Sequence, residues 1–380
     1  MLRKLIIFVL ILCLICFPVT LFSPQTADAT TITPTDYVSL GDSIAYGYSA
    51  PSGQGYSDLF NAYLQSKPEL AGSQFYNLSH PGDTSSDLLE KLKNNSKVKE
   101  RLNKSRIVTI SIGGNNLLGP VISSLAGVYD LKLLDPQLNS KLAQALRSDK
   151  NLEGTLLQLA SSGTIERQLA DGVASFKKDW PGIIQSLKSL APDSQVYALN
   201  IYNPFAQNDP FFSLIDPYVE KINSVIEVGE GYSYADIYTC FLKGYEQKPL
   251  NYNLLQGNTD PHPTPEGHLF IFQTLCSLYD LTNAIPWDSR RNVPEDKTWT
   301  VKFTDTLAQS AAGYIQVYTN SGLSLNLSVQ TTKIGSDFLV VKPPSNGYLP
   351  GSYCLLIKQG LPSRSGQILK KSICMRFTVE

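Results

Sequence analysis

The sequence predicts an α/β domain built on a parallel sheet, followed by a small all-β sandwich. Short apolar runs, each followed by a turn and a helical pattern, alternate along residues 30–285, which is typical of a parallel sheet covered by helices on both faces. From residue 298 to residue 380 the apolar residues recur at every second position instead, which is typical of β-strands. The 380 residues, 42% of them apolar, are enough to bury a core of this size.

Residues 1–29 have the pattern of a secretory signal peptide. Arg3 and Lys4 precede an apolar stretch that ends at Phe22, and Ala27 and Ala29 supply small residues at the positions that signal peptidase reads. We expect cleavage after residue 29 and a secreted, extracellular protein. An uncleaved membrane anchor is the alternative, because the apolar stretch approaches the length of a bilayer span.

The charge balance argues against a nucleic-acid partner. Lys and Arg number 32 against 33 for Asp and Glu, so the formal net charge is −1 and no basic surface for phosphate backbones is expected. The sequence also lacks a phosphate-binding P-loop, a His-Glu-x-x-His helix and a Gly-x-Gly-x-x-Gly turn. We therefore expect no metal or organic cofactor.

Four apolar runs predict the strands of the α/β portion. They cover residues 37–40, 75–78, 107–112 and 196–201. Between the last two runs, residues 117–190 have mostly helical periodicity, which is unusually long for one connection between strands.

Two helix starts carry capping signals. Thr84 and Asp87 have the spacing of a capping box. Thr264 followed by Pro265 combines an N-cap residue with a proline in the first helical turn. We expect helices to begin at both places, the second running toward Leu281.

The C-terminal portion begins after an expected linker at residues 286–297, which contains two prolines and several charges. Two alternating runs near the C-terminus, joined by a polar turn, predict a hairpin that sets Cys354 opposite Cys374 on its outer face. We expect these two cysteines to form a disulfide, and Cys240 and Cys276 to form another within the α/β portion. Two unrelated buried thiols in the hairpin are the alternative.

Polar loops follow the predicted strands at their carboxyl ends, where α/β sheets place their active sites. Ser43 lies on the loop after the first strand, Gly82 after the second and Asn115 after the third. Asp260 and His262 lie close together just before the final helix. Each segment alone is an ordinary turn, but together they supply a hydroxyl, an imidazole, a carboxylate and hydrogen-bond donors. Of the other histidines, His80 is interpreted as a surface residue and His268 as structural.

In order, these four segments resemble the GDSL family, also called SGNH hydrolases, over roughly residues 37–281. The resemblance implies a flavodoxin-like α/β/α sandwich around a parallel sheet of about five strands, and esterase or lipase activity. It also implies that Ser43 is the nucleophile and His262 the base, with the N–H groups of Ser43 and Gly82 and the side-chain amide of Asn115 forming an oxyanion hole.

The sequence departs from the family pattern at two places. The aspartate that orients the histidine usually precedes it by three residues, where this chain has Thr259; its carboxylate, Asp260, precedes His262 by two. We expect flanking prolines to bend Asp260 back toward His262, the alternative being a Ser-His dyad completed by a backbone carbonyl. Asn116 replaces a frequent aspartate and is expected to affect only loop hydrogen bonds.

The C-terminal portion resembles the immunoglobulin-like modules of secreted and cell-wall proteins of Gram-positive bacteria. The resemblance rests on the stretches WTVKF, GSYCLLI and KSICMRFTV. It implies contact with the cell wall, and wall association of the secreted protein, through this portion.

The expected function is that of a secreted serine esterase or lipase acting on a lipid, an acylated small molecule or an acylated carbohydrate. One alternative is an O-acetylesterase acting on cell-wall or plant polysaccharide, and another is a wall-associated binding protein on an inactive hydrolase scaffold. The apolar residues that open the helical insertion are expected either to line an acyl channel or lid, or to be helix core; they are Leu117, Leu118, Val121, Ile122 and Leu125.

Overall fold

The computed structural model describes most of the chain after residue 34. The described residues are 35–132, 135, 137–252, 258, 260–308, 310–325, 327–330 and 336–380. The predicted signal peptide and Thr259 therefore lie outside them. Within these ranges, no helix combines the length and the apolar character needed to cross a membrane.

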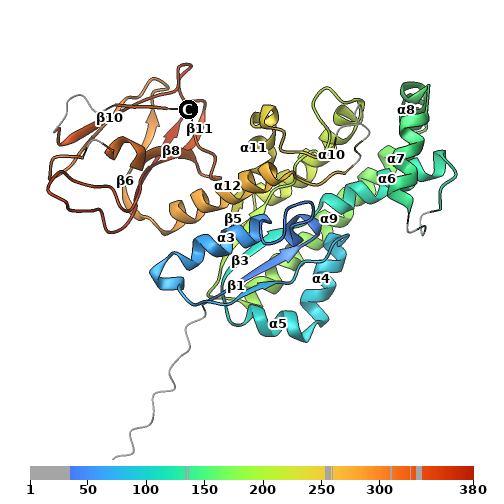
Figure 1. Ribbon diagram of the computed structural model, residues 1–380, viewed down its shortest axis with the longest axis horizontal. Helices are drawn as coiled ribbons and strands as arrows, with labels where there is room; N and C mark the ends of the chain where they lie inside the picture. The colour runs from blue at the N-terminus through green and yellow to red at the C-terminus, as the bar shows by residue number, and fades with distance from the viewer. Residues whose placement is uncertain are drawn as a thin grey trace, which may run out of the picture. The chain divides into compact units, whose positions relative to one another are not determined.

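A five-stranded parallel sheet forms the centre of the first domain, with strand order β2-β1-β3-β4-β5 (Figure 1). The first four strands lie where the apolar runs predicted them, whereas the fifth was missed because its three residues form no apolar run. Their bounds are β1 Asp36–Gly41, β2 Phe75–Asn77, β3 Ser105–Ser111, β4 Gln195–Leu199 and β5 Ser233–Ala235.

Helices cover both faces of this sheet because its strands send alternate side chains to opposite sides. Tyr37 of β1 packs in one apolar layer and the next residue, Val38, packs in the other. The first layer contains α2 (Ser43–Tyr46), α3 (Tyr56–Gln65), α11 (Ile237–Lys243) and α12 (Pro265–Asn283). The second contains α4 (Ser85–Asn94), α5 (Ser96–Leu102), α6 (Gly114–Val128), α9 (Thr164–Leu190) and α10 (Pro210–Glu227). The predicted α/β/α sandwich is confirmed.

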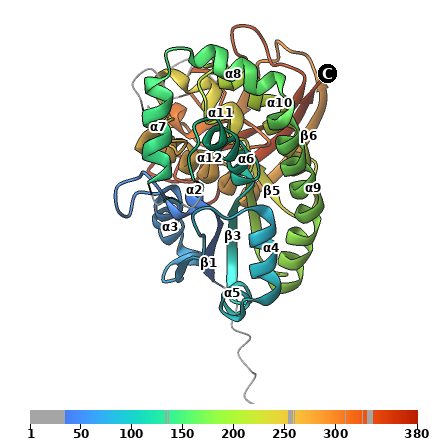
Figure 2. The same ribbon diagram turned by 90° about the vertical axis from the view of Figure 1, so that its right-hand side faces the viewer.

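The long insertion between β3 and β4 is helical, as its periodicity predicted. It contains α6, α7 (Leu138–Ser148), α8 (Leu152–Ser161) and α9. Helix α5 leads directly into β3 and marks the amino ends of the strands. Figures 1 and 2 show α7 and α8 at the opposite end of the domain from α5. The insertion therefore extends beyond the carboxyl ends of the strands, where the polar loops lie.

Both predicted helix caps are present. The Thr84 side chain accepts a hydrogen bond from the Asp87 backbone while the Asp87 carboxylate accepts one from the Thr84 backbone, which completes the capping box of α4. At α12, the Thr264 hydroxyl accepts from the Gly267 N–H at 3.1 Å, and Pro265 is the first helical residue. The N-cap of α12 is thus fixed two residues after His262.

The C-terminal portion consists of two sheets, with strand orders β7-β10-β9 and β6-β12-β11-β8. Leu339 of the first sheet and Leu355 and Phe377 of the second belong to one buried cluster, so the two sheets pack as a sandwich around a shared core. The strands are β6 Ile285–Val293, β7 Trp299–Lys302, β8 Ile315–Thr319, β9 Ser328–Gln330, β10 Phe338–Lys342, β11 Gly351–Ile357 and β12 Ile373–Val379.

The linker expected at residues 286–297 is wrong over most of its length. Strand β6 occupies it as far as Val293 and pairs in parallel with β12, with Pro286 opposite Cys374 and Trp287 opposite Met375. The strand lies at the edge of its sheet, where prolines and charged side chains are tolerated because one row of backbone groups faces away from a neighbour. The prolines and charges that suggested a linker are therefore also compatible with an edge strand.

The Cys354–Cys374 disulfide is present, as predicted, with a Cα–Cα distance of 6.0 Å. The predicted register is wrong by two residues, because Cys354 faces Arg376 and Cys374 faces Leu356. The bond therefore spans the hairpin diagonally. The predicted outer position is also wrong: both cysteines are buried, in a small cluster with Leu281.

The second predicted disulfide is absent, and Cys240 and Cys276 are free thiols. Cys240 lies on α11 and accepts a hydrogen bond from the Thr274 hydroxyl at 3.7 Å, while Cys276 lies on α12. Both pack against the same apolar layer, and burial raises the pKa of each thiol. An even number of cysteines gave no information on whether these two side chains face each other.

Candidate active site

Ser43 lies on the tight turn between β1 and α2. Gly41 has a φ of +136°, and a Cβ at this position would lie 2.0 Å from the Ser111 carbonyl oxygen, so only glycine fits. Asp42 then caps α2, with its carboxylate accepting from the Ile44 N–H at 2.9 Å. These two constraints place Ser43 at the first position of α2, at the carboxyl end of β1.

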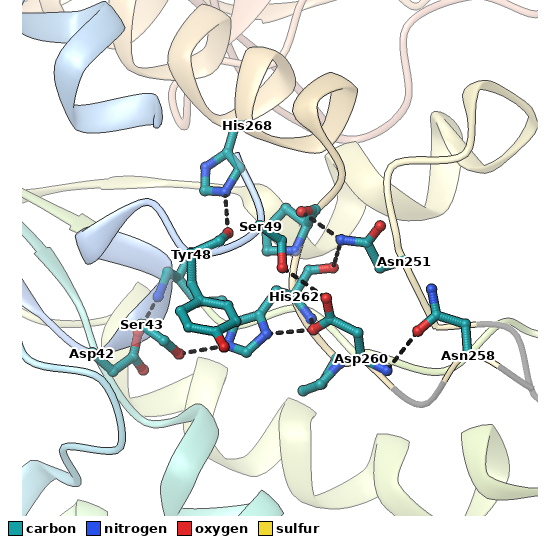
Figure 3. A network of polar contacts seen from close by, with 12 residues as sticks. Asp42, Ser43, Tyr48, Ser49, Asn251, Asn258, Asp260, His262 and His268 are labelled. Atoms are coloured by element: carbon teal, nitrogen blue, oxygen red, sulfur yellow. Dashed lines mark hydrogen bonds and ion pairs between the residues drawn. The ribbon is translucent and has the colours of Figure 1, made fainter. Parts of the chain in front are cut away.

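Ser43, His262 and Asp260 form a chain of polar contacts (Figure 3). The Ser43 Oγ lies 2.9 Å from the His262 Nε2, and the His262 Nδ1 contacts the Asp260 Oδ1. The same carboxylate oxygen accepts from the His262 backbone N–H at 3.0 Å. The two-residue spacing thus brings the carboxylate back onto the imidazole through a local turn.

The electrostatics of the carboxylate suit this arrangement. Burial alone would raise the pKa of Asp260, but hydrogen bonds from His262 and Ser49 outweigh it and hold the pKa below its usual value. Asp260 is therefore ionised near neutral pH and accepts a proton-bearing Nδ1. In the tautomer with its proton on Nδ1, the ring has its lone pair on Nε2, facing the Ser43 hydroxyl.

Neighbouring side chains hold the backbone around His262. The Asn251 N–H and its side-chain amide donate to the His262 carbonyl at 3.1 and 3.2 Å, and the Tyr202 hydroxyl donates to the Pro261 carbonyl at 3.0 Å. Since Pro261 and Pro263 have no N–H, these contacts reach the segment through its carbonyls. None of the supporting residues belongs to a recognisable motif, and sequence reasoning missed them.

Gly82 and Asn115 line the same groove as Ser43 and His262. Gly82 has a φ of +90°. The Asn115 side-chain amide donates one hydrogen to the Asp83 carbonyl at 2.9 Å, and its second amide hydrogen is available to another acceptor. Asn116 is buried and bonds to the backbone N–H and hydroxyl of Ser85, in agreement with its expected role in loop hydrogen bonding.

The two remaining histidines lie outside this chain of contacts. The His80 side chain is 70% exposed and lies 3.3 Å from the Asp83 carboxylate. His268 is fully buried on α12, where its Nε2 donates to the Tyr48 carbonyl at 2.9 Å and its Nδ1 accepts from the Tyr56 N–H at 3.3 Å. Burial lowers the pKa of His268, so it is neutral at pH 7.

A mostly apolar pocket opens beside Ser43, Asn115 and His262. Its apolar lining comes from α6, the end of β4 and the loop after it, α10 and the starts of α2, α11 and α12, with Ile201, Phe205, Ile215 and Val219 among the residues that sequence reasoning missed. Ile201 and Phe205 follow the carboxyl end of β4, whereas Ile215 and Val219 lie on α10. A second, wider groove continues over α6 and α7.

The five apolar residues that open the insertion divide between the two expected roles. Leu117, Leu118 and Val121 line the pocket, and Ile122 and Leu125 line the wider groove. Leu117, Val121 and Leu125 are also buried in the second apolar layer. One face of α6 therefore serves as core and as pocket wall.

Across the described ranges, no group of three or more His, Cys, Asp or Glu side chains is suited to hold a metal ion.

Comparison with known proteins agrees with this arrangement. Residues 39–269 match the model of the GDSL-like Lipase/Acylhydrolase family, which is more than half of the chain. The chain belongs to this family. A relative of this GDSL-like chain is the uncharacterized protein YpmR of Bacillus subtilis, 25% identical over 187 residues. The alignment covers 49% of this chain and 56% of YpmR, so the chain matches little more than half the length of that relative.

Solved structures similar to this GDSL-like chain include three hydrolases. They are the lipase Lip_vut3 from a goat rumen metagenome (20% identity, TM-score 0.42, 63% of this chain and 95% of that one), the phospholipase A1 of Streptomyces albidoflavus NA297 (19%, 0.43, 63% and 96%) and the acetylxylan esterase Axe2 of Geobacillus stearothermophilus (16%, 0.37, 63% and 91%).

Asp42 makes the stability of the domain dependent on pH. Burial raises the pKa of Asp42 to about 7, although the Ile44 N–H opposes the shift. The folded state binds this proton more tightly than the unfolded chain does. The wild type therefore loses folding stability as the pH rises from about 4 to about 7. Asp42→Asn keeps an oxygen for the Ile44 N–H and cannot ionise. The free energy of unfolding of Asp42→Asn minus that of the wild type should therefore increase by on the order of 1–4 kcal/mol between pH 4.5 and pH 8.

Urea unfolding of both proteins at pH 4.5, 6 and 8 measures this difference. A difference that stays constant with pH would show that Asp42 is ionised throughout the range.

Proposed function

We propose that this chain is a secreted serine esterase or lipase that hydrolyses carboxylic esters through an acyl-enzyme on Ser43. The observation that carries the proposal is the 2.9 Å contact between the Ser43 Oγ and the His262 Nε2, backed by the ionised Asp260 and open to an apolar pocket. A serine hydroxyl becomes a competent nucleophile when a neutral imidazole at this distance removes its proton.

In the acylation step, His262 Nε2 takes the hydroxyl proton as the Ser43 Oγ attacks the ester carbonyl carbon. Asp260 stabilises the imidazolium that forms. The carbonyl oxygen becomes an oxyanion, to which the N–H groups of Ser43 and Gly82 and the free amide hydrogen of Asn115 donate. The C–O bond to the alcohol then breaks, and the alcohol leaves with the proton from His262. Water repeats the sequence on the acyl-enzyme and releases the acid.

The pocket beside Ser43 favours an acyl chain longer than acetyl. Aliphatic and aromatic side chains from several elements line it, which is a longer apolar wall than a two-carbon acyl group would contact. This is the reason to prefer a lipid or another long-chain ester over an acetylated polysaccharide as substrate. The assembled Ser43, His262 and Asp260 likewise favour an enzyme over a binding protein on an inactive scaffold.

Export and wall contact are part of the same proposal. Residues 1–29 have the pattern of a signal peptide, and the Cys354–Cys374 disulfide is of a kind that persists in oxidising compartments. The sandwich that carries the disulfide resembles immunoglobulin-like modules of secreted and wall proteins. We assign it the contact with the cell wall.

Ser43→Ala and His262→Ala should each reduce the turnover of nitrophenyl butyrate by at least about a thousandfold, since each removes part of one proton-transfer unit. The double variant should lose no more than either single variant. Initial rates, with circular dichroism to verify folding, test this. Fluorophosphonate labelling of the wild type at Ser43, absent in Ser43→Ala, is the accompanying control. Turnover that survives in either single variant would refute the assignment.

Asp260→Asn should lower turnover by about 100-fold or more, because the amide neither stabilises the imidazolium nor holds the same ring tautomer. The measurement is kcat on a nitrophenyl ester at pH 8. Near-normal kcat in Asp260→Asn, together with an inactive Ser43→Ala, would favour the dyad completed by a backbone carbonyl.

Leu118→Trp should shorten the acyl chain that the enzyme accepts, because Leu118 is partly exposed and lines the pocket from α6. We expect kcat/KM to fall by about tenfold or more for nitrophenyl decanoate and to change by less than about twofold for nitrophenyl acetate. Val128→Trp is the matched control, since Val128 ends the same helix, is 43% exposed and lies outside the pocket. Equal losses on both esters would place the acyl chain elsewhere.

A further inference from the structure

The loop that follows α2, residues 47–49, reaches across to the segment that carries Asp260 and His262 (Figure 3). The Tyr48 ring lies 4.4 Å from the His262 ring, centroid to centroid. The Ser49 hydroxyl donates to the Asp260 Oδ2 at 2.7 Å, although the two residues are 211 positions apart in the chain. The loop thus contacts both the imidazole and the carboxylate from one side.

The two oxygens of Asp260 have separate partners. Oδ1 accepts from the backbone N–H of His262 and contacts its ring Nδ1, whereas Oδ2 accepts from Ser49. The Asp260 side chain is 30% exposed, and rotation of an aspartate carboxyl about its last bond meets only broad, shallow minima. A donor on Oδ2 opposes this rotation and keeps Oδ1 directed at the imidazole.

Independent contacts fix the loop that carries Ser49. The Tyr48 N–H donates to the Ser43 carbonyl at 3.0 Å, and the Tyr48 carbonyl accepts from the buried His268 at 2.9 Å. His268 is held in turn by the Tyr56 N–H. Ser49 itself has a φ of +66°, a left-handed conformation that serine rarely adopts and that persists only where the surroundings impose it. The hydroxyl is therefore presented from a rigid support.

We propose that Ser49 is a positioning residue of the hydrolytic site, which acts on His262 only through Asp260; the inference rests on the proposed function. Asp260 lies two residues before His262, and Pro261 and Pro263 offer no N–H for holding the segment in place. The local His262 N–H donates to Oδ1, so a hydrogen bond to Oδ2 depends on a donor from elsewhere in the chain. The Ser49 hydroxyl provides it, and as a donor it also favours the ionised form of Asp260.

Ser49→Gly tests the proposal, because it removes the hydroxyl while glycine adopts the left-handed conformation without strain. We expect kcat on nitrophenyl butyrate to fall by about tenfold, with KM changed by less than about twofold. Asn292→Gly is the matched control: Asn292 also has a positive φ, 53°, and lies in β6 of the sandwich. It should leave kcat unchanged. An unchanged kcat in Ser49→Gly would overturn the proposal.

The same substitution in the Asp260→Ala background separates positioning from a general structural role. If Ser49 acts only through Asp260, Ser49→Gly has no further effect on kcat once the carboxylate is gone. A tenfold loss in both backgrounds would overturn the proposal, since Ser49 would then act by another route.

A spectroscopic signature keeps this test independent of the proposed function. Among the three histidines, His268 has an unprotonated Nδ1 and His80 is exposed to exchange with water, so a slowly exchanging, far-downfield Nδ1 proton belongs to His262. In protein labelled with 15N-histidine, this resonance should be lost or shifted upfield in Ser49→Gly and retained in Asn292→Gly. An unchanged resonance in Ser49→Gly refutes the positioning role. Absence of ester hydrolysis in the wild type would instead refute the proposed function.

Discussion

The contact between the Ser43 Oγ and the His262 Nε2 is the constraint that the rest of the α/β domain maintains. It joins two segments that are 219 residues apart in the chain. One is the turn between β1 and α2, and the other is the irregular segment that precedes α12. Ser43 is fixed by the close approach of β1 to β3 at Gly41, and His262 by the capped start of α12 and by hydrogen bonds to the carbonyls beside it. The packing of the sheet and its helices thus determines the distance between the Ser43 Oγ and the His262 Nε2.

The polar groups and the apolar wall of the site come from different parts of the chain. The polar groups of the site come from loops at strand ends and from the segment before α12, whereas much of the apolar wall comes from the insertion between β3 and β4. Helix α6 links the two, since Asn115 in its first turn lines the pocket beside Ser43 and Leu118 and Val121 extend the wall along the next turns. The polar groups and the apolar wall therefore come from different stretches of chain that meet on one helix.

Local signals made much of this architecture predictable. Four strands were marked by apolar runs, α4 and α12 by their caps, and Ser43 and His262 by segments that match a family pattern. The features that the sequence did not predict depend mostly on contacts between residues far apart in the chain. Strand β5 is too short to form a run, and β6 is recognisable as a strand only once its partner β12 is known. The free thiols of Cys240 and Cys276, and the contact of Ser49 with Asp260, depend on which helices and loops meet in space, which no spacing along the chain records.

The location of the disulfide has a practical consequence for handling the protein. Among the described residues, the one disulfide lies in the sandwich, and the α/β domain has no covalent cross-link but two partly buried thiols of raised pKa. Thiolate, the form that attacks disulfides and alkylating reagents, is therefore scarce in that domain at neutral pH. Among the described residues, the bond that a reducing agent could break therefore lies in the C-terminal sandwich, and only that part of the protein needs an oxidising environment to form its disulfide.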